Sequence, residues 1–210
     1  KRINAKIQTI MLEVQQKLQG MQNRMMRRPT GSVAQMRQAL EREQNAGLDR
    51  IIASLDLFKP LCRWNFFMVK QVNTMRMMFL YQQRKFDEVD KLLPKCVFFD
   101  PQSMCMKMAR MYKRKDPKLD KFFRWKCSRL KADAAVLPVA LYSWILVKEN
   151  RIDDAIKVLN DAKAKTSNET LAHNREALQN GRVKQFSNAP LGEAWYALML
   201  EEPKMQKVQQ

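Results

Sequence analysis

The chain has 210 residues and a mass of 24.8 kDa, a length that allows one or at most two domains. Hydrophobic residues make up 46% of it, which excludes a wholly disordered protein, and an excess of Lys and Arg gives a net charge of +18. This charge predicts an acidic partner, whether protein, nucleic acid or lipid surface. One histidine and five glycines argue against His-based catalysis and glycine-lined phosphate loops.

Cysteine spacing and hydropathy indicate the compartment. Cys62, Cys96, Cys105 and Cys127 form no C-x-x-C pair, and no second histidine completes a zinc set. We therefore expect four buried, reduced thiols, an intracellular, cytoplasmic chain, and no cofactor. No apolar run reaches the roughly 18 residues of a membrane span. Because the chain starts at Lys1 without an initiator methionine, we expect a piece of a longer protein, and an upstream membrane anchor is one hypothesis for what precedes it.

Residues 1–28 are predicted to form one long helix, because apolar side chains recur every three or four residues. Its polar face carries seven basic residues and one acid, Glu13. Three roles stay open for this arm: packing on its own domain, self-association or pairing with a partner as a coiled coil, and lying on an anionic membrane. Pro29 and Gly31 end the helix.

Further helices are predicted from residue 33 to near Pro60 and from 62 to 82. The second of them is apolar on most sides, which is typical of a buried helix. No segment shows sustained period-two alternation, so the predicted fold class is all-α.

A repeat of 33 residues runs through the middle of the chain. The four-residue segments that begin at Phe86, Leu119 and Ile152 share the order apolar, acidic, any residue, apolar. Each follows a polar run that ends one helix, and each begins another apolar-periodic stretch. Helix, short turn and helix at a period near 34 is typical of helical-hairpin solenoids.

From about Val72 to Thr170 these units resemble the tetratricopeptide repeat family. The best unit has the family's packing and turn residues at Tyr142, Ser143, Leu146, Asn150, Ile152, Ala155, Leu159 and Ala162. An earlier unit matches at Phe86, Leu93, Cys96 and Asp100-Pro101 but departs at Met77 and Val89, and the middle unit departs at Phe122 and Arg129. An irregular helical bundle is the alternative.

The resemblance implies a TPR-like helical-hairpin solenoid between a long N-terminal amphipathic helix and a C-terminal helical cap. The expected organisation is an N-terminal arm and hairpin at 1–60, the repeat region at 61–180, a capping helix at 181–203 and a frayed tail at 204–210. Asn180-Gly181 is a strong signal for a helix end before the cap.

Half of the charge excess lies between Lys107 and Lys131, where eleven basic residues and only two acids, Asp116 and Asp120, give a local charge of +9. Aromatic residues interleave with this charge, a combination that single-stranded nucleic-acid binders use: Tyr112, Phe122, Phe123 and Trp125. The last three also stand at helical core spacing. A packed core under a solvated basic face is therefore the alternative interpretation.

In the tetratricopeptide repeat family the first helix of each unit lines a groove for extended peptides or partner helices. The resemblance implies that the partner-binding groove is lined by Gln71, Thr74, Met78, Tyr81, Lys107, Met111, Arg114, Lys115, Leu137, Ala140, Trp144 and Lys148. A basic groove with apolar pockets suits an acidic peptide that carries a hydrophobic anchor.

We therefore predict a non-enzymatic protein-binding scaffold without catalytic, cofactor-binding or metal-ligating residues. His173 has no nucleophile context, Met104, Met106 and Met108 are interpreted as core filler, and the Glu201-Glu202 pair as solvated charges. The alternative function is nucleic-acid binding through residues 107–131. Membrane attachment through residues 1–28 is compatible with either function.

Overall fold

The computed structural model describes residue 16, residues 33–58 and residues 66–203. All regular secondary structure within these residues is helical, which confirms the predicted all-α class. The chain divides into two compact units, Lys1–Val97 and Phe98–Gln210. In the part of the chain described, no helix combines the length and apolarity that crossing a membrane requires.

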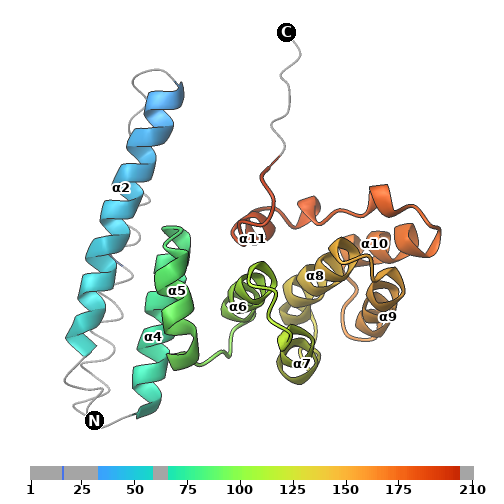
Figure 1. Ribbon diagram of the computed structural model, residues 1–210. Helices are drawn as coiled ribbons and strands as arrows, with labels where there is room; N and C mark the ends of the chain where they lie inside the picture. The colour runs from blue at the N-terminus through green and yellow to red at the C-terminus, as the bar shows by residue number, and fades with distance from the viewer. Residues whose placement is uncertain (1–15, 17–32, 59–65, 204–210) are drawn as a thin grey trace. The chain divides into compact units, whose positions relative to one another are not determined.

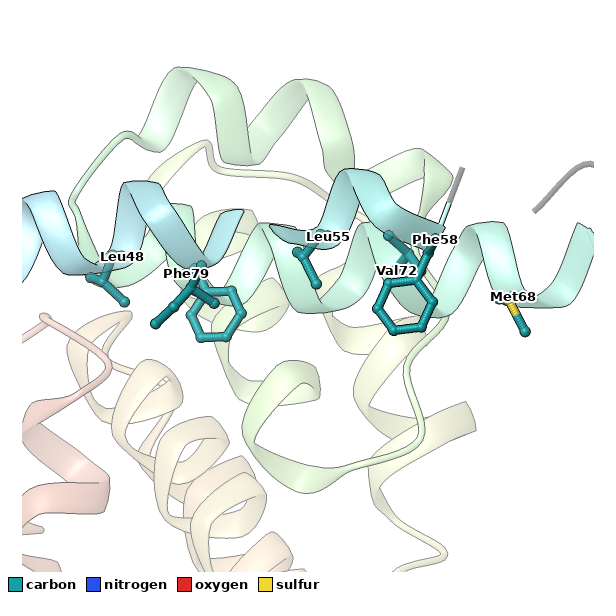
Figure 2. Packing of buried hydrophobic residues seen from close by; sticks show 7 residues of the cluster. Leu48, Leu55, Phe58, Met68, Val72 and Phe79 are labelled. Carbon is teal, nitrogen blue, oxygen red and sulfur yellow. The ribbon is translucent and has the colours of Figure 1, made fainter. Parts of the chain in front are cut away.

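The first unit is built around a helix pair. Its elements are α2 (Val33–Ser54), η1 (Leu55–Phe58), α4 (Phe66–Gln82), α5 (Phe86–Leu92) and η2 (Leu93–Lys95). One core cluster joins α2 and η1 to α4 (Figure 2), and its buried members are Leu48, Ile51, Leu55, Phe58, Met68, Val72 and Phe79. α2 and α4 share this core, and the first compact unit extends to Val97.

Polar contacts reinforce this helix pair at the end of α4. The Gln83 amide donates hydrogen bonds to the Asn45 carbonyl at 3.0 Å and to the Asp49 carboxylate at 2.8 Å. Lys85 Nζ lies 3.2 Å from the same carboxylate. The hydrogen bond from Gln83, opposed by burial and aided by Lys85, lowers the pKa of Asp49, so this acid stays ionised and tied to α4 near neutral pH.

The second unit consists of four helices of 11 to 16 residues, α6, α8, α9 and α10, and several shorter elements. Its elements are α6 (Pro101–Lys113), α7 (Leu119–Phe122), η3 (Phe123–Cys127), α8 (Asp133–Lys148), α9 (Ile152–Lys163), α10 (Glu169–Gln179), η4 (Val183–Gln185), η5 (Ala189–Leu191) and α11 (Glu193–Tyr196). In Figure 1, α7 and α9 lie on one side of the row formed by α6, α8 and α10, and α11 lies on the other. The predicted capping helix at 181–203 is not one helix. This stretch contains two 3-10 helices, η4 and η5, and the single helical turn α11.

The same turn ends α4, α6, α8 and α10. In each, the second residue after the helix has a positive φ: 59° at Arg84, 52° at Lys115, 59° at Asn150 and 69° at Gly181. Each turn has the pair of backbone hydrogen bonds of a Schellman motif, as where Lys115 N–H donates to the Tyr112 carbonyl at 3.0 Å and Asp116 N–H to the Met111 carbonyl at 2.9 Å. The turns predicted at Asn150 and at Gly181 are thus confirmed.

The cysteine predictions are met in part. Cys105 and Cys127 are buried, whereas Cys96 is only half-buried, and no disulfide joins the three cysteines described. Cys62, the arm at 1–28 apart from the exposed helical Gln16, and the tail at 204–210 lie outside the described residues.

Candidate functional site

The eight side chains predicted as the main partner contacts differ in exposure. Thr74, Tyr81, Met111 and Trp144 are between 2% and 7% exposed, so they form the interior of their units and do not line an open groove. Lys107 is half-buried, and Arg114, Lys115 and Lys148 are exposed. Of the predicted set, only the basic members present their ends to solvent.

The burial of Thr74 and Tyr81 follows from local contacts in the first unit. The Thr74 hydroxyl accepts a hydrogen bond from Val97 N–H at 3.0 Å and lies 2.7 Å from the Val97 carbonyl, which ties the chain beyond α5 to α4. The Tyr81 ring packs edge-on against Phe86, with ring centroids 5.4 Å apart. Both side chains hold the α4–α5 pair together.

Trp144 lies at the centre of an aromatic surface on α6 and α8 in the second unit. Tyr112 packs edge-on against it with centroids 5.5 Å apart, and Lys148 Nζ lies 5.2 Å from its centroid. We call Tyr112, Trp144 and Lys148 the Trp144 platform. Tyr112 follows the predicted Met111 by one position, so the contacting face of α6 is rotated by one residue from the prediction.

The C-terminal segment, residues 192–201, covers the Trp144 platform. The Trp195 ring, 1% exposed, packs edge-on against Trp144 with centroids 5.7 Å apart. The Glu201 carboxylate accepts hydrogen bonds from both indoles, from Trp144 Nε1 at 2.8 Å and from Trp195 Nε1 at 2.9 Å. The interpretation of Glu201 as a solvated charge is therefore wrong, and the predicted groove position Trp144 is occupied by the chain's own segment.

A buried polar chain holds the residues just before this segment. The Asn188 amide donates to the Ala140 carbonyl on α8 at 2.9 Å and accepts from the Asn174 amide on α10 at 2.8 Å. Asn174 in turn accepts from Ser187 N–H at 2.9 Å. Ala140, Asn174 and Asn188 are all 0% exposed, so these polar groups depend wholly on one another.

A second surface of the same unit is basic and open. It consists of exposed residues on the end of α6, on α7, on η3 and on the turns between them, and we call it the basic surface: Lys113, Arg114, Lys115, Lys118, Lys121, Arg124, Trp125, Arg129 and Lys131. None of its lysines and arginines forms an ion pair with a carboxylate of the described residues.

The two acids of this stretch are engaged elsewhere. The Asp120 carboxylate faces the Arg151 guanidinium, with oxygen–nitrogen distances of 3.0 and 3.3 Å. The Asp116 carboxylate accepts the backbone N–H of Lys118 at 2.9 Å. Neither acid thus forms an ion pair with a lysine or arginine of the basic surface.

The aromatic residues of the basic stretch divide between core and surface. Phe123 is buried and stacks on Tyr142 with centroids 3.9 Å apart, and Phe122 packs edge-on against Phe98. Trp125 is 59% exposed, and Lys126 Nζ lies 4.5 Å from its centroid. The core interpretation therefore fails for Trp125, which is an exposed indole among basic residues.

A surface cavity of about 630 Å³ adjoins the basic surface at the turns after α6 and α8. Its lining carries both signs of charge, Lys113, Lys115 and Arg151 with Asp116, Asp120 and Glu149. Arg151 also contacts Asp154 at 2.9 Å and Glu149 at 3.3 Å, so it crosslinks several acids. Burial raises the pKa of Asp120, but hydrogen bonds from Arg151 and Tyr142 outweigh it and leave that pKa below its usual value.

We expect Asp120→Asn to lower the free energy of unfolding by about 1 kcal/mol at pH 7, because the half-exposed Asp120–Arg151 pair is lost. Because the pKa of Asp120 is lowered by folding, the ionised carboxylate stabilises the folded protein at any pH above its unfolded-state pKa of about 4. This contribution is lost as the pH falls through the folded-state pKa. Urea titrations at pH 7 and near pH 2 measure the difference, which should shrink in acid. The control is Asp116→Asn, which keeps an acceptor for Lys118 N–H; an equal loss in both variants would contradict the prediction.

The described residues hold no group of three or more His, Cys, Asp or Glu side chains that could bind a metal ion.

The sulfur atoms of Met104 and Met108 lie 3.9 and 3.5 Å from Cys127 Sγ. Burial raises the pKa of Cys127 to about 12, although the positive charge of Lys126 opposes the rise. The thiol is therefore protonated near neutral pH. His173 is exposed on α10.

Comparisons of this chain with protein-family models, with curated proteins and with solved structures found no match. The resemblance to the tetratricopeptide repeat family thus stays a prediction.

Proposed function

We propose that this chain is a non-enzymatic, TPR-like helical-repeat scaffold that binds an acidic segment of a partner protein on the basic surface. The recurring Schellman turns after α4, α6, α8 and α10 support the repeat interpretation. The observation that carries the proposed function is that Asp120 pairs with Arg151 and Asp116 accepts only a backbone N–H, so neither acid forms an ion pair with a lysine or arginine of the basic surface. Basic side chains without an ion-pair partner speed the approach of an acidic protein and disfavour the binding of a basic protein.

An acidic protein segment fits this surface better than a nucleic acid does. Single-stranded nucleic-acid binders stack successive bases on several aromatic side chains, whereas in the basic stretch Phe123 is buried, Phe122 is half-buried and Trp125 is exposed. One exposed indole suits one hydrophobic anchor of a peptide.

The test is charge reversal with a matched control. A fluorescent 12-residue peptide rich in Glu with one central Leu is titrated against the double variant Lys118→Glu/Lys121→Glu and against Lys157→Glu/Lys163→Glu, whose exposed lysines lie on α9. Both variants change the net charge equally. We expect at least tenfold weaker binding for the first and less than threefold for the second, at about 150 mM salt.

Two results would overturn the proposed function. An equal loss in both variants would mean that binding follows net charge and not the basic surface. A 12-nucleotide single-stranded RNA that binds more tightly than the peptide at the same salt, with a steep decline of affinity as salt rises, would assign the surface to nucleic acid.

A further inference from the structure

The contact between the C-terminal segment and the Trp144 platform has the form of a bound peptide ligand. Trp195 supplies an aromatic anchor with 1% of its surface exposed, and Glu201 supplies a carboxylate that both indole N–H groups hold at 2.8 and 2.9 Å. An aromatic anchor in a pocket with a paired polar group beside it is the usual arrangement at the centre of a protein interface.

The segment has little regular structure of its own to hold it in place. Its helix α11 is a single turn, Glu193–Tyr196, and short helices are not stable by themselves in water. The segment therefore owes its position to tertiary contacts, which include the burial of Trp195 and Leu198 and the hydrogen bonds of Glu201.

A hinge and an anchor precede the segment. Gly192 has φ 62° and ψ −134°, a backbone conformation that glycine adopts far more readily than other residues, and a side chain added there would meet nothing within 4 Å. Asn188, four residues earlier, is fixed to α8 and α10 by its buried hydrogen bonds. Rotation at Gly192 would lift Trp195 and Glu201 off the platform while Asn188 stays bound.

We propose that the Trp144 platform is a second peptide-docking site. Its ligand is a partner segment with an indole followed six residues later by a carboxylate. Residues 192–201 occupy the site as an intramolecular competitor. The platform supplies the matching groups: the Trp144 ring, which Tyr112 supports from α6, for the indole, and the Trp144 N–H for the carboxylate. The Lys148 ammonium beside the Trp144 ring adds positive charge that attracts an acidic segment. This site is separate from the basic surface, so either proposal can fail without the other.

The first experiment opens the platform and supplies the ligand in trans. The probe is a fluorescent peptide with the sequence of residues 192–203, and the opened protein is Trp195→Ala/Glu201→Gln, with Glu202→Gln as the matched control because Glu202 is exposed. We expect the opened protein to bind at least tenfold more tightly than the wild type and the Glu202→Gln variant. Adding Trp144→Ala should abolish the gain. A folded opened protein, judged by circular dichroism, that binds no better than wild type would overturn the proposal.

The second experiment uses the unmodified chain and does not depend on the variant's folding. Hydrogen exchange should be at least tenfold faster at the Trp195 indole N–H than at the backbone N–H groups of α8, because the segment opens without the rest of the unit. Exchange at equal rates would mean that the segment opens only on global unfolding and would overturn the proposal. A wild-type dimer that exchanges this segment between copies would also overturn it, since the occupant would then be a second copy of this chain.

Discussion

Phe123→Ala is expected to lower the free energy of unfolding of the second unit by about 3–5 kcal/mol, the usual loss when a buried phenylalanine is truncated. The Phe123 ring is 5% exposed and stacks on Tyr142 with an interplanar angle of 18°. Truncation leaves a cavity between η3 and α8 that the neighbouring side chains fill only in part. The loss also removes the stacked contact, which contributes beyond the buried area.

Trp125 provides the matched control, because it belongs to the same five-residue π-helical turn as Phe123 and is exposed. Trp125→Ala should change the free energy of unfolding by less than about 1 kcal/mol, the scale of its exposed contact with Lys126. Urea titrations followed by tryptophan fluorescence measure both variants, since Trp144 and Trp195 report on the second unit. Equal losses in the two variants would contradict the separation of core and surface roles. Trp125→Ala should still weaken the acidic peptide if Trp125 is its anchor.

Helical periodicity predicted the longer helices because burying one helix face requires a local spacing of apolar residues. The predicted turn at Asn150 falls where α8 ends. Turn chemistry is equally local: a positive φ favours glycine or asparagine, and Asn150 and Gly181 supply them. These parts of the fold could therefore be predicted from the sequence.

The different exposures of Phe123 and Trp125 agree with helical geometry, because side chains two positions apart point to nearly opposite sides of a helix. Between Phe123 and Ser128 the backbone makes a π-type hydrogen bond, Ser128 N–H to the Phe123 carbonyl at 3.0 Å, which spans five residues where an α-helix spans four. The prediction of one core face for Phe122, Phe123 and Trp125 was wrong for Trp125, because it placed residues two positions apart on the same face of a helix.

The contact of Glu201 with Trp144 joins residues 57 positions apart, and local patterns contain no information on such pairs. A glutamate next to a second glutamate near a chain end has the pattern of a solvated charge, and only the packing of residues 192–201 on α8 buries it. The same holds for Asn174 and Asn188. Their burial is a consequence of tertiary structure, and asparagine in a polar stretch gives no sequence signal for it.

Asn188→Ala tests that buried polar chain and is expected to cost about 2–4 kcal/mol of unfolding free energy. The substitution removes a 0% exposed side chain and leaves the Ala140 carbonyl and the Asn174 amide without their partners at 2.9 and 2.8 Å. A buried polar group that loses its partner bears the full cost of desolvation, about 1–3 kcal/mol for each, and partial relaxation reduces the sum.

The exposed Asn160, whose amide oxygen accepts from Gln179 at 3.3 Å, is the control for Asn188. Asn160→Ala should change the free energy of unfolding by less than about 0.5 kcal/mol, because water replaces the lost hydrogen bond. Urea titrations of both variants give the comparison. A loss below 1 kcal/mol for Asn188→Ala would mean that water reaches Ala140 and Asn174 in the folded protein. In that case Asn188 could not hold the chain while Gly192 turns, and the hinge proposed for the C-terminal segment would have to lie earlier in the sequence.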